Sequence, residues 1–343
     1  MNALTKTLTS KKFAKLKISR QRRKVWVISC FALAISIAGF VFSFLTPSIH
    51  SPLKLGLDFT GGTQIKLDRE CIEKCSPIKV SDISNSLSKI SFNNENNLRS
   101  TNILESKIQL LDDSQSLIIR LPFLSASEGQ EVINTVEKIS GPLEKGGQSV
   151  ETIGPTLGGQ LLRSSLISLL VAFAGISIYI GLRYDKIYSL LAIIALAHDV
   201  IIVCGVFSWL GILLSVEINS LFAVSLLTIA GYSVNDTVVV FDRIREQNKD
   251  NSFRSLSERI DYAVSATLTR TLFTSGTTLL PLIALIAFGG STLFWFSISL
   301  ALGVVVGSWS SIALAPSLLS LKEPLQNTSL QETGKELDLD DEV

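Results

Sequence analysis

Side chains that bind metals or form disulfides are scarce in this sequence. The 343 residues include 2 His and 4 Cys, and no CxxC motif or Cys/His cluster is present. Zinc sites need closely spaced Cys and His ligands, and two histidines are too few for a His-rich site. Cys30 and Cys204 lie inside apolar runs. We therefore expect no metal, no cofactor and no small disulfide-rich fold.

Charge is also scarce. Charged residues make up 18% of the chain, whereas a soluble domain carries about 25%. Lys and Arg total 31 and Asp and Glu total 30, a net charge of +1, so no basic excess favours binding to nucleic acid. The sequence has no Walker A loop, no HExxH motif and no nucleophile–base constellation. We expect neither an enzyme nor a nucleic-acid partner.

Long apolar runs dominate the sequence instead, and hydrophobic residues make up 47% of it. A helix that crosses the bilayer needs about 20 mostly apolar residues. Six runs meet this requirement: Val25–Leu45, Ser164–Leu182, Ile187–Leu210, Ile218–Phe241, Ala263–Phe288 and Leu293–Leu319. The first exceeds the apolar core of a signal peptide, about 7–15 residues. We predict a polytopic α-helical membrane protein, with helix 1 at 25–45 and helices 2–6 within 161–320.

The positive charges predict which side of the membrane each loop faces. Nine Lys or Arg residues precede the first run, two lie in Arg183–Lys186 and five in Asp242–Tyr262. The alternate loops Gly211–Glu217 and Gly289–Thr292 have none. Basic loops stay in the cytoplasm, so both termini are expected there, and the long segment 46–160 is expected outside.

The two cytoplasmic ends have opposite charge. The N-terminus, 1–24, is basic, and we interpret it as a topology signal that also contacts anionic lipid in the bilayer. Binding to a ribosome or a nucleic acid is the alternative. The C-terminal tail, 321–343, is acidic near its end and is expected to be solvated.

The segment 46–160 has its own pattern of strands and helices. Alternating or apolar runs predict strands, and apolar spacings of three and four predict helices. The expected order is strand 63–68, helix 80–92, strands 102–111 and 116–121, helix 127–139 and strand 148–153. This β-α-β-β-α-β order is ferredoxin-like. We therefore predict one external α+β ferredoxin-like (βαββαβ) domain between helices 1 and 2.

Cys71 and Cys75 lie between the first strand and the first helix of that domain. Outside the cytoplasm a disulfide is chemically permitted. The spacing would close a small ring, and two free thiols are the alternative.

Two of the predicted membrane helices carry oppositely charged residues, Asp236 and Arg270. A charge at the centre of a membrane helix costs about 2.5–3.5 kcal/mol, so it is a functional hypothesis by default. Each lies in a stripe of polar residues with helical spacing: Ser225, Thr228, Tyr232 and Asn235 on the fourth helix, and Thr267, Thr271, Thr274 and Thr277 on the fifth. Consecutive helices run antiparallel, so the two stripes are expected to face each other with Asp236 and Arg270 at similar depth.

Two interpretations of Asp236 and Arg270 follow. If Arg270 moves toward and away from Asp236, the proton affinity of the carboxylate changes with conformation, as a proton or ion relay requires. Alternatively, the two form a static ion pair that fixes helix register.

The third membrane helix adds His198 and Asp199 near its middle. Asp199 is a second relay candidate, or it forms a hydrogen bond that packs helices. His198 is interpreted as a packed polar residue that does not share a helix face with its neighbour Asp199. In the last helix, Gly303 and Gly307 fit G-x-x-x-G, which predicts close helix packing.

Five motifs make the sequence similar to a known family. They are Leu55–Gly62 (with Asp58, Gly61 and Gly62), Gly154–Gly158 (with Gly154, Pro155 and Gly158), Ala197–Asp199, Gly231–Glu246 and Thr267–Thr278. Together they resemble the SecF subunits of the SecD/SecF family, within the resistance-nodulation-division superfamily. The second motif leads into the second membrane helix and reads as a hinge or as a simple turn.

The resemblance implies a function and partners. Members of this family pair with a SecD-like subunit, associate with the SecYEG channel and further translocon accessory subunits, and use the proton-motive force to help late steps of preprotein export. Asp236 and Arg270 match the family's membrane carboxylate and arginine, and His198 and Asp199 match its His-Asp pair. The Cys71–Cys75 loop departs from the common pattern. The bacterial plasma (inner) membrane is the implied location, and a thylakoid-type internal membrane is the alternative.

Two rival functions remain at this point. One is a small-molecule or lipid exporter of the same superfamily, and the other is a structural subunit of the translocon that couples no ion. Whether the coupling ion is H⁺ or Na⁺ is left open.

Overall fold

The computed structural model describes residues 17–47, 49–71, 75–90, 107–111, 115–247 and 255–322. The expected acidic tail and most of the basic N-terminus lie outside these residues. The chain divides into two compact units, which we call the helix bundle (1–54, 168–216 and 221–343) and the sheet domain (55–167 and 217–220).

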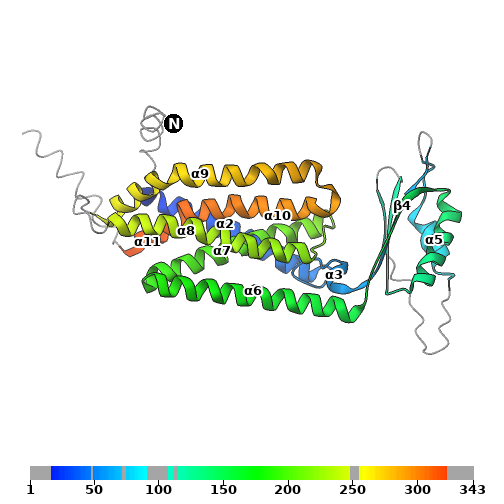
Figure 1. Ribbon diagram of the computed structural model, residues 1–343. Helices are drawn as coiled ribbons and strands as arrows, with labels where there is room; N and C mark the ends of the chain where they lie inside the picture. The colour runs from blue at the N-terminus through cyan, green and yellow to red at the C-terminus, as the bar shows by residue number, and fades with distance from the viewer. Residues whose placement is uncertain are drawn as a thin grey trace, which may run out of the picture. The chain divides into compact units, whose positions relative to one another are not determined.

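The helices of the bundle match the predicted membrane spans. They are α2 (Ile18–Leu45), α6 (Pro155–Arg183), α7 (Lys186–Leu213), α8 (Ser220–Gln247), α9 (Leu256–Phe288) and α10 (Gly290–Trp309), which continues through the π-helix η3 (Ser310–Leu314) into α11 (Ala315–Leu319) and η4 (Ser320–Lys322) (Figure 1). Within the described residues, six helical segments are long and apolar enough to cross a membrane. The prediction of six spans is confirmed.

The centre of the bundle is formed by α7, α8 and the α10–α11 segment. Between 50% and 61% of the apolar stretch of each is buried, against 6% for α6 and 17% for α9. The G-x-x-x-G motif lies in this centre. A Cβ atom on Gly303 would lie 2.2 Å from Cγ1 of Ile229 on α8, and one on Gly307 would lie 3.2 Å from Cβ of Ser233. The predicted close packing is confirmed.

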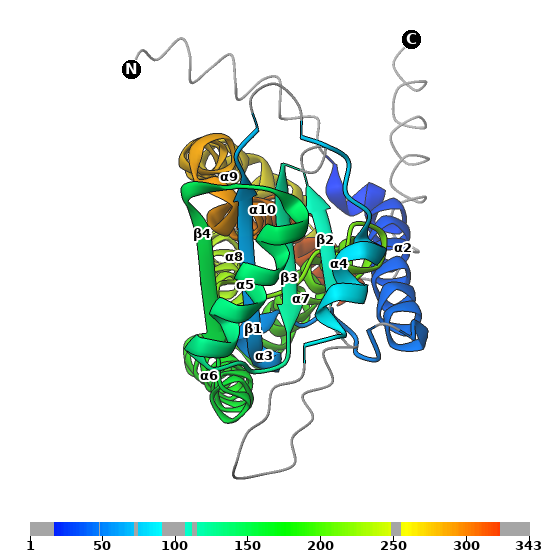
Figure 2. The same cartoon turned by 90° about the vertical axis from the view of Figure 1, so that its right-hand side faces the viewer.

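The sheet domain has the predicted order of elements. Its strands are β1 (Gly62–Arg69), β2 (Lys107–Leu111), β3 (Ser116–Leu121) and β4 (Leu143–Ile153), and its helices are α3 (Leu57–Thr60), α4 (Val80–Leu87) and α5 (Ala126–Ser140). The sheet is antiparallel with strand order β2-β3-β1-β4, and α4 and α5 cover one face of it (Figure 2). This is the βαββαβ arrangement.

Alternate apolar residues along the strands form the core of the sheet domain. Ile65 and Leu67 of β1 and Ile119 of β3 are fully buried on the face that α4 and α5 cover. The start of α5 is fixed by a capping box, in which the Ser125 side chain accepts a hydrogen bond from the Glu128 backbone amide and the Glu128 carboxylate accepts one from the Ser125 backbone amide.

Several boundaries differ from those predicted. Helix α2 begins at Ile18 and α6 at Pro155, each before its apolar run, because hydropathy marks the part that crosses the membrane rather than the whole helix. The helix expected over 80–92 ends at Leu87, and residues 91 and 92 lie outside the described residues. Strand β4 begins at Leu143, before the predicted Gln148, because its pairing with β1 continues past an irregularity in the register.

Cys71 and Cys75 are joined by a disulfide, with Cα atoms 5.3 Å apart. Arg69 supports this loop, since its guanidinium donates to the backbone oxygens of Ser76 and Ser140. Burial lowers the pKa of Arg69 from its ordinary value.

Candidate functional site

Asp236 lies on α8 inside the bundle and is 4% exposed. Its Oδ2 atom is buried without a hydrogen-bond partner. Asn235, its neighbour in the sequence, is exposed at the surface of the chain. A buried carboxylate oxygen without a partner is costly, which makes Asp236 an unusual residue in this bundle.

Arg270 lies on α9 and interacts electrostatically with Asp236. The side chain of Arg270 is exposed on this chain. Within the part of the chain that the structure describes, Asp236 and Arg270 form no ion pair within 4.0 Å. The static ion pair considered from the sequence is therefore absent, whereas the predicted proximity is consistent with the electrostatic interaction.

The two polar stripes, which were expected to face each other, meet only in part, where the Tyr232 hydroxyl of α8 donates to Ser275 of α9. Thr228, Asn235 and Thr274 are exposed, whereas Ser225, Thr267 and Thr271 are buried. Several of the threonines donate to carbonyls of their own helix, as Thr267 does to Ala263 and Thr274 does to Arg270. Their hydroxyls are satisfied locally and need no partner on the next helix.

Asp199 lies at the centre of a hydrogen-bond network and is fully buried. Its Oδ2 atom accepts from the hydroxyl of Ser233 on α8 at 2.5 Å and from that of Ser310 in η3 at 2.6 Å. Its Oδ1 atom lies 2.9 Å from Nδ1 of His198. Asp199 thus joins α7, α8 and the end of α10.

The contact between His198 and Asp199 contradicts the prediction that the two side chains lie on separate faces of the helix. Neighbours on a helix point about 100° apart, but both side chains are long enough to turn toward each other in a buried site. The Nε2 atom of His198 is buried without a partner, so the ring has one satisfied and one unsatisfied nitrogen.

Hydroxyl groups extend the network across the bundle. Thr237 lies 3.0 Å from Ser311 in η3, the Tyr232 hydroxyl donates to Ser275 of α9 at 2.9 Å, and Ser275 lies 2.6 Å from Ser308 of α10. The serines in this network were not predicted from the sequence. The run Ser308, Ser310 and Ser311 inside an apolar helix was the available signal.

The glycine motifs lie in the sheet domain. Gly61 and Gly62 have φ values of 68° and 124°, a region that favours glycine. A Cβ atom on Gly158 of α6 would lie 2.8 Å from the Gly61 backbone nitrogen. The segment with Asp58, Gly61 and Gly62 therefore packs against the start of α6, at Pro155 and Gly158, just after Gly154.

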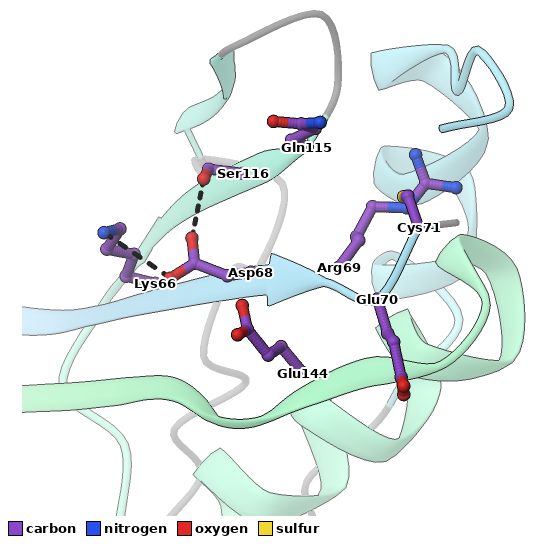
Figure 3. A pocket seen from close by; sticks show the side chains of 8 residues that line it. All are labelled: Lys66, Asp68, Arg69, Glu70, Cys71, Gln115, Ser116 and Glu144. Carbon is purple, nitrogen blue, oxygen red and sulfur yellow. Dashed lines mark hydrogen bonds and ion pairs between the residues drawn. The ribbon is translucent and has the colours of Figure 1, made fainter. Parts of the chain in front are cut away.

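A polar cleft lies at one end of the sheet (Figure 3). Two of its charged groups contact each other, because Asp68 accepts from Ser116 at 2.6 Å and lies 3.6 Å from Lys66. No group of three or more His, Cys, Asp or Glu side chains that could hold a metal ion occurs in the described ranges.

Comparison with known proteins identifies the family to which this chain belongs. Residues 132–323 match the family model "Protein export membrane protein SecD/SecF, C-terminal", and residues 48–70 match the "SecD/SecF GG Motif". Curated proteins named protein translocase subunit SecF are similar: that of Prochlorococcus marinus is 62% identical over 89% of this chain and 95% of the relative, and that of Synechocystis is 36% identical over 89% and 93%.

A solved structure is similar too. The crystal structure of SecDF from Thermus thermophilus, titled a translocon-associated membrane protein, superposes with a TM-score of 0.70 and 29% identity over 89% of this chain. The match covers 38% of the SecDF chain, so this chain spans well under half of it. The chain belongs to the SecD/SecF family of protein export membrane proteins.

Proposed function

We propose that this chain is an accessory subunit of the Sec protein-export translocase in the bacterial inner membrane, and that it uses the proton-motive force to drive late steps of preprotein translocation. The observation that carries the proposal is Asp236, a buried carboxylate that forms no ion pair with the residues the structure describes and has Arg270 within electrostatic reach. Family membership supports the role in export.

The absence of a fixed partner is what a relay requires. A carboxylate that is locked in an ion pair keeps its charge in every conformation. The protonation state of Asp236 instead depends on where Arg270 lies, because the field of a guanidinium inside a membrane protein changes steeply with distance. A change in protonation at Asp236 therefore favours one arrangement of α8 and α9 over another.

Asp199 has a different role in this proposal. Its carboxylate accepts from two hydroxyls and contacts His198, so it holds α7, α8 and η3 together. We assign it to holding these three segments as one body against which α9 moves, and not to the site of proton exchange.

The exposed surface around Arg270 supports the proposal that a SecD-like subunit binds this chain. Arg270, Asn235 and Thr274 are exposed on this chain within membrane-spanning helices. An arginine that faces lipid costs about 2.5–3.5 kcal/mol, whereas a second half of six helices would cover it and complete the site, as in other transporters built from repeats. SecYEG, further accessory subunits and the preprotein are the remaining partners that we propose.

The test is export of a secreted reporter in cells whose only copy carries Asp236→Asn. Asparagine keeps the shape of the side chain and removes its titration. The complex with the partner subunit is quantified in the same membranes, and Asp82→Asn, an exposed aspartate of the sheet domain, is the matched control. Loss of export in the first variant alone, with the complex intact, supports the proposal.

The same experiment separates the rival functions. A structural subunit predicts normal export from Asp236→Asn as long as the complex assembles. A small-molecule or lipid exporter predicts that protein export is unchanged even when the chain is deleted. Replacing the proton gradient by a sodium gradient in reconstituted vesicles then distinguishes H⁺ from Na⁺ as the coupling ion.

A further inference from the structure

The first residue of α8 belongs to the sheet domain and not to the bundle. Residues 217–220 group with 55–167 by their contacts, although they lie far away in the sequence. The backbone shows why. Leu55 and Ile218 form a parallel β-bridge, and the amide of Gly56 donates to the Ile218 oxygen at 2.8 Å. The helix that carries Asp236 therefore starts inside the sheet domain.

Asp58 fastens this start. One oxygen of its carboxylate, Oδ2, accepts from the backbone amide of Ser220 at 2.8 Å and from the Ser220 hydroxyl at 2.5 Å. The first amides of a helix have no partner within the helix, and a negative charge is favourable at that end. Asp58 thus serves as a cap for α8 although it lies on α3, 162 residues earlier.

A second contact holds the same segment to the sheet. The Arg120 guanidinium on β3 pairs with Glu217 and also donates to Gln64 of β1 at 3.0 Å. The side chain of Glu217 is 13% exposed and that of Arg120 is 25% exposed. Ion pairs that are partly buried resist screening better than those on the surface.

The loop that carries Asp58 also holds the start of α6. A Cβ atom on Gly61 would lie 2.8 Å from the Pro155 Cα atom, and one on Gly56 would lie 2.8 Å from the Ile218 oxygen. Both ends of the loop are therefore packed tightly against the beginnings of helices that continue into the bundle.

We propose that Asp58 is a positioning residue that fastens α8 to the sheet domain, so that movements caused by proton exchange at Asp236 are transmitted to that domain. This inference rests on the proposed function. Asp236 lies sixteen residues after Ser220 on one continuous helix, a distance of about 24 Å at 1.5 Å per residue. We call Asp58, Arg120, Glu217 and Ser220 the α8 clasp.

The experiment compares Asp58→Ala, Ser220→Ala and Asp82→Asn in membranes that hold the full complex. Three quantities are measured: gradient-dependent export of a reporter into membrane vesicles, the amount of complex, and labelling of Asp236 by dicyclohexylcarbodiimide, which modifies protonated carboxyl groups in apolar surroundings. Labelling reports proton exchange at Asp236 independently of export.

We expect Asp58→Ala to lower gradient-dependent export at least about tenfold, because a hydrogen-bond acceptor with full charge is lost. The amount of complex and the labelling of Asp236 stay at the wild-type level, and so does export by Asp82→Asn. Ser220→Ala gives a smaller loss of gradient-dependent export. The double variant Asp58→Ala/Ser220→Ala loses no more export than Asp58→Ala alone, since both substitutions remove the same contact.

Two results would overturn the inference. One is normal gradient-dependent export by both Asp58→Ala and Ser220→Ala. The other is a loss of export by Ser220→Ala that is matched by the loss of the complex or of Asp236 labelling, which would make the clasp merely structural. Failure of the proposed function is seen separately, as normal export by Asp236→Asn.

Discussion

Gly303 is the position where a single methyl group should disturb the centre of the bundle. In Gly303→Ala the new Cβ atom would lie 2.2 Å from Cγ1 and 2.4 Å from Cδ1 of Ile229, whereas carbon atoms pack at about 3.5–4.0 Å. Ile229 is 1% exposed and branched at Cβ, so its side chain has no space to turn away. Helices α8 and α10 must therefore separate.

Overpacking of this kind costs about 1–3 kcal/mol. The purified complex is heated in detergent, and the unfolding of this subunit is followed by tryptophan fluorescence. We expect a lower Tm for Gly303→Ala by several degrees, since each kcal/mol corresponds to about 2–4 °C in chains of 150–250 residues. Adding Ile229→Ala to Gly303→Ala should restore part of the lost Tm, because the smaller side chain leaves space for the new Cβ atom.

Gly231→Ala is the matched control, because it lies on α8 and a Cβ atom there would meet nothing within 4 Å. It should leave the Tm unchanged or raise it, since alanine loses less backbone entropy on folding. Equal Tm values for the two glycine variants would refute the packing of α8 against α10 described above.

Other predictions concern single contacts. Ser125→Ala should destabilise α5 by about 1 kcal/mol through loss of its cap, measured as faster amide hydrogen exchange in that helix, and unchanged exchange would contradict the capping box. Asp199→Asn and Ser310→Ala should be non-additive in thermal stability because they share one hydrogen bond, and additive losses would contradict the network. Cys71 and Cys75 should react with a maleimide only after reduction, and labelling of the untreated protein would disprove the disulfide.

Local patterns predicted the elements of this fold well. The length of the apolar runs predicted the six spans, and alternation of apolar and polar residues predicted strands such as Ser116–Leu121. Both patterns are contained in a short stretch of sequence, because each reflects only which residues face lipid, water or the core. The π-helix at Ser310–Leu314 was not predictable in this way, since an extra residue per turn leaves no distinct hydrophobic period.

Contacts between helices were harder to predict than the helices themselves. Helical spacing predicts that Asp236 and Arg270 lie at similar depth, but whether they form an ion pair depends on the rotation of α8 and α9, which the sequence does not specify. The bonds of Asp199 to Ser233 and Ser310 depend on the same rotations. The contact of Asp58 with Ser220 joins two segments 162 residues apart, and neither segment alone carried a signal for it.

The central claim is that proton exchange at Asp236 contributes to export. The most direct measurement is the part of reporter export that depends on this complex, in membrane vesicles with and without a protonophore. We predict that the protonophore abolishes this part for the wild type. The Asp236→Asn complex should lack it under both conditions although it assembles normally. A complex with Asp236→Asn that still shows full, protonophore-sensitive export would contradict the claim.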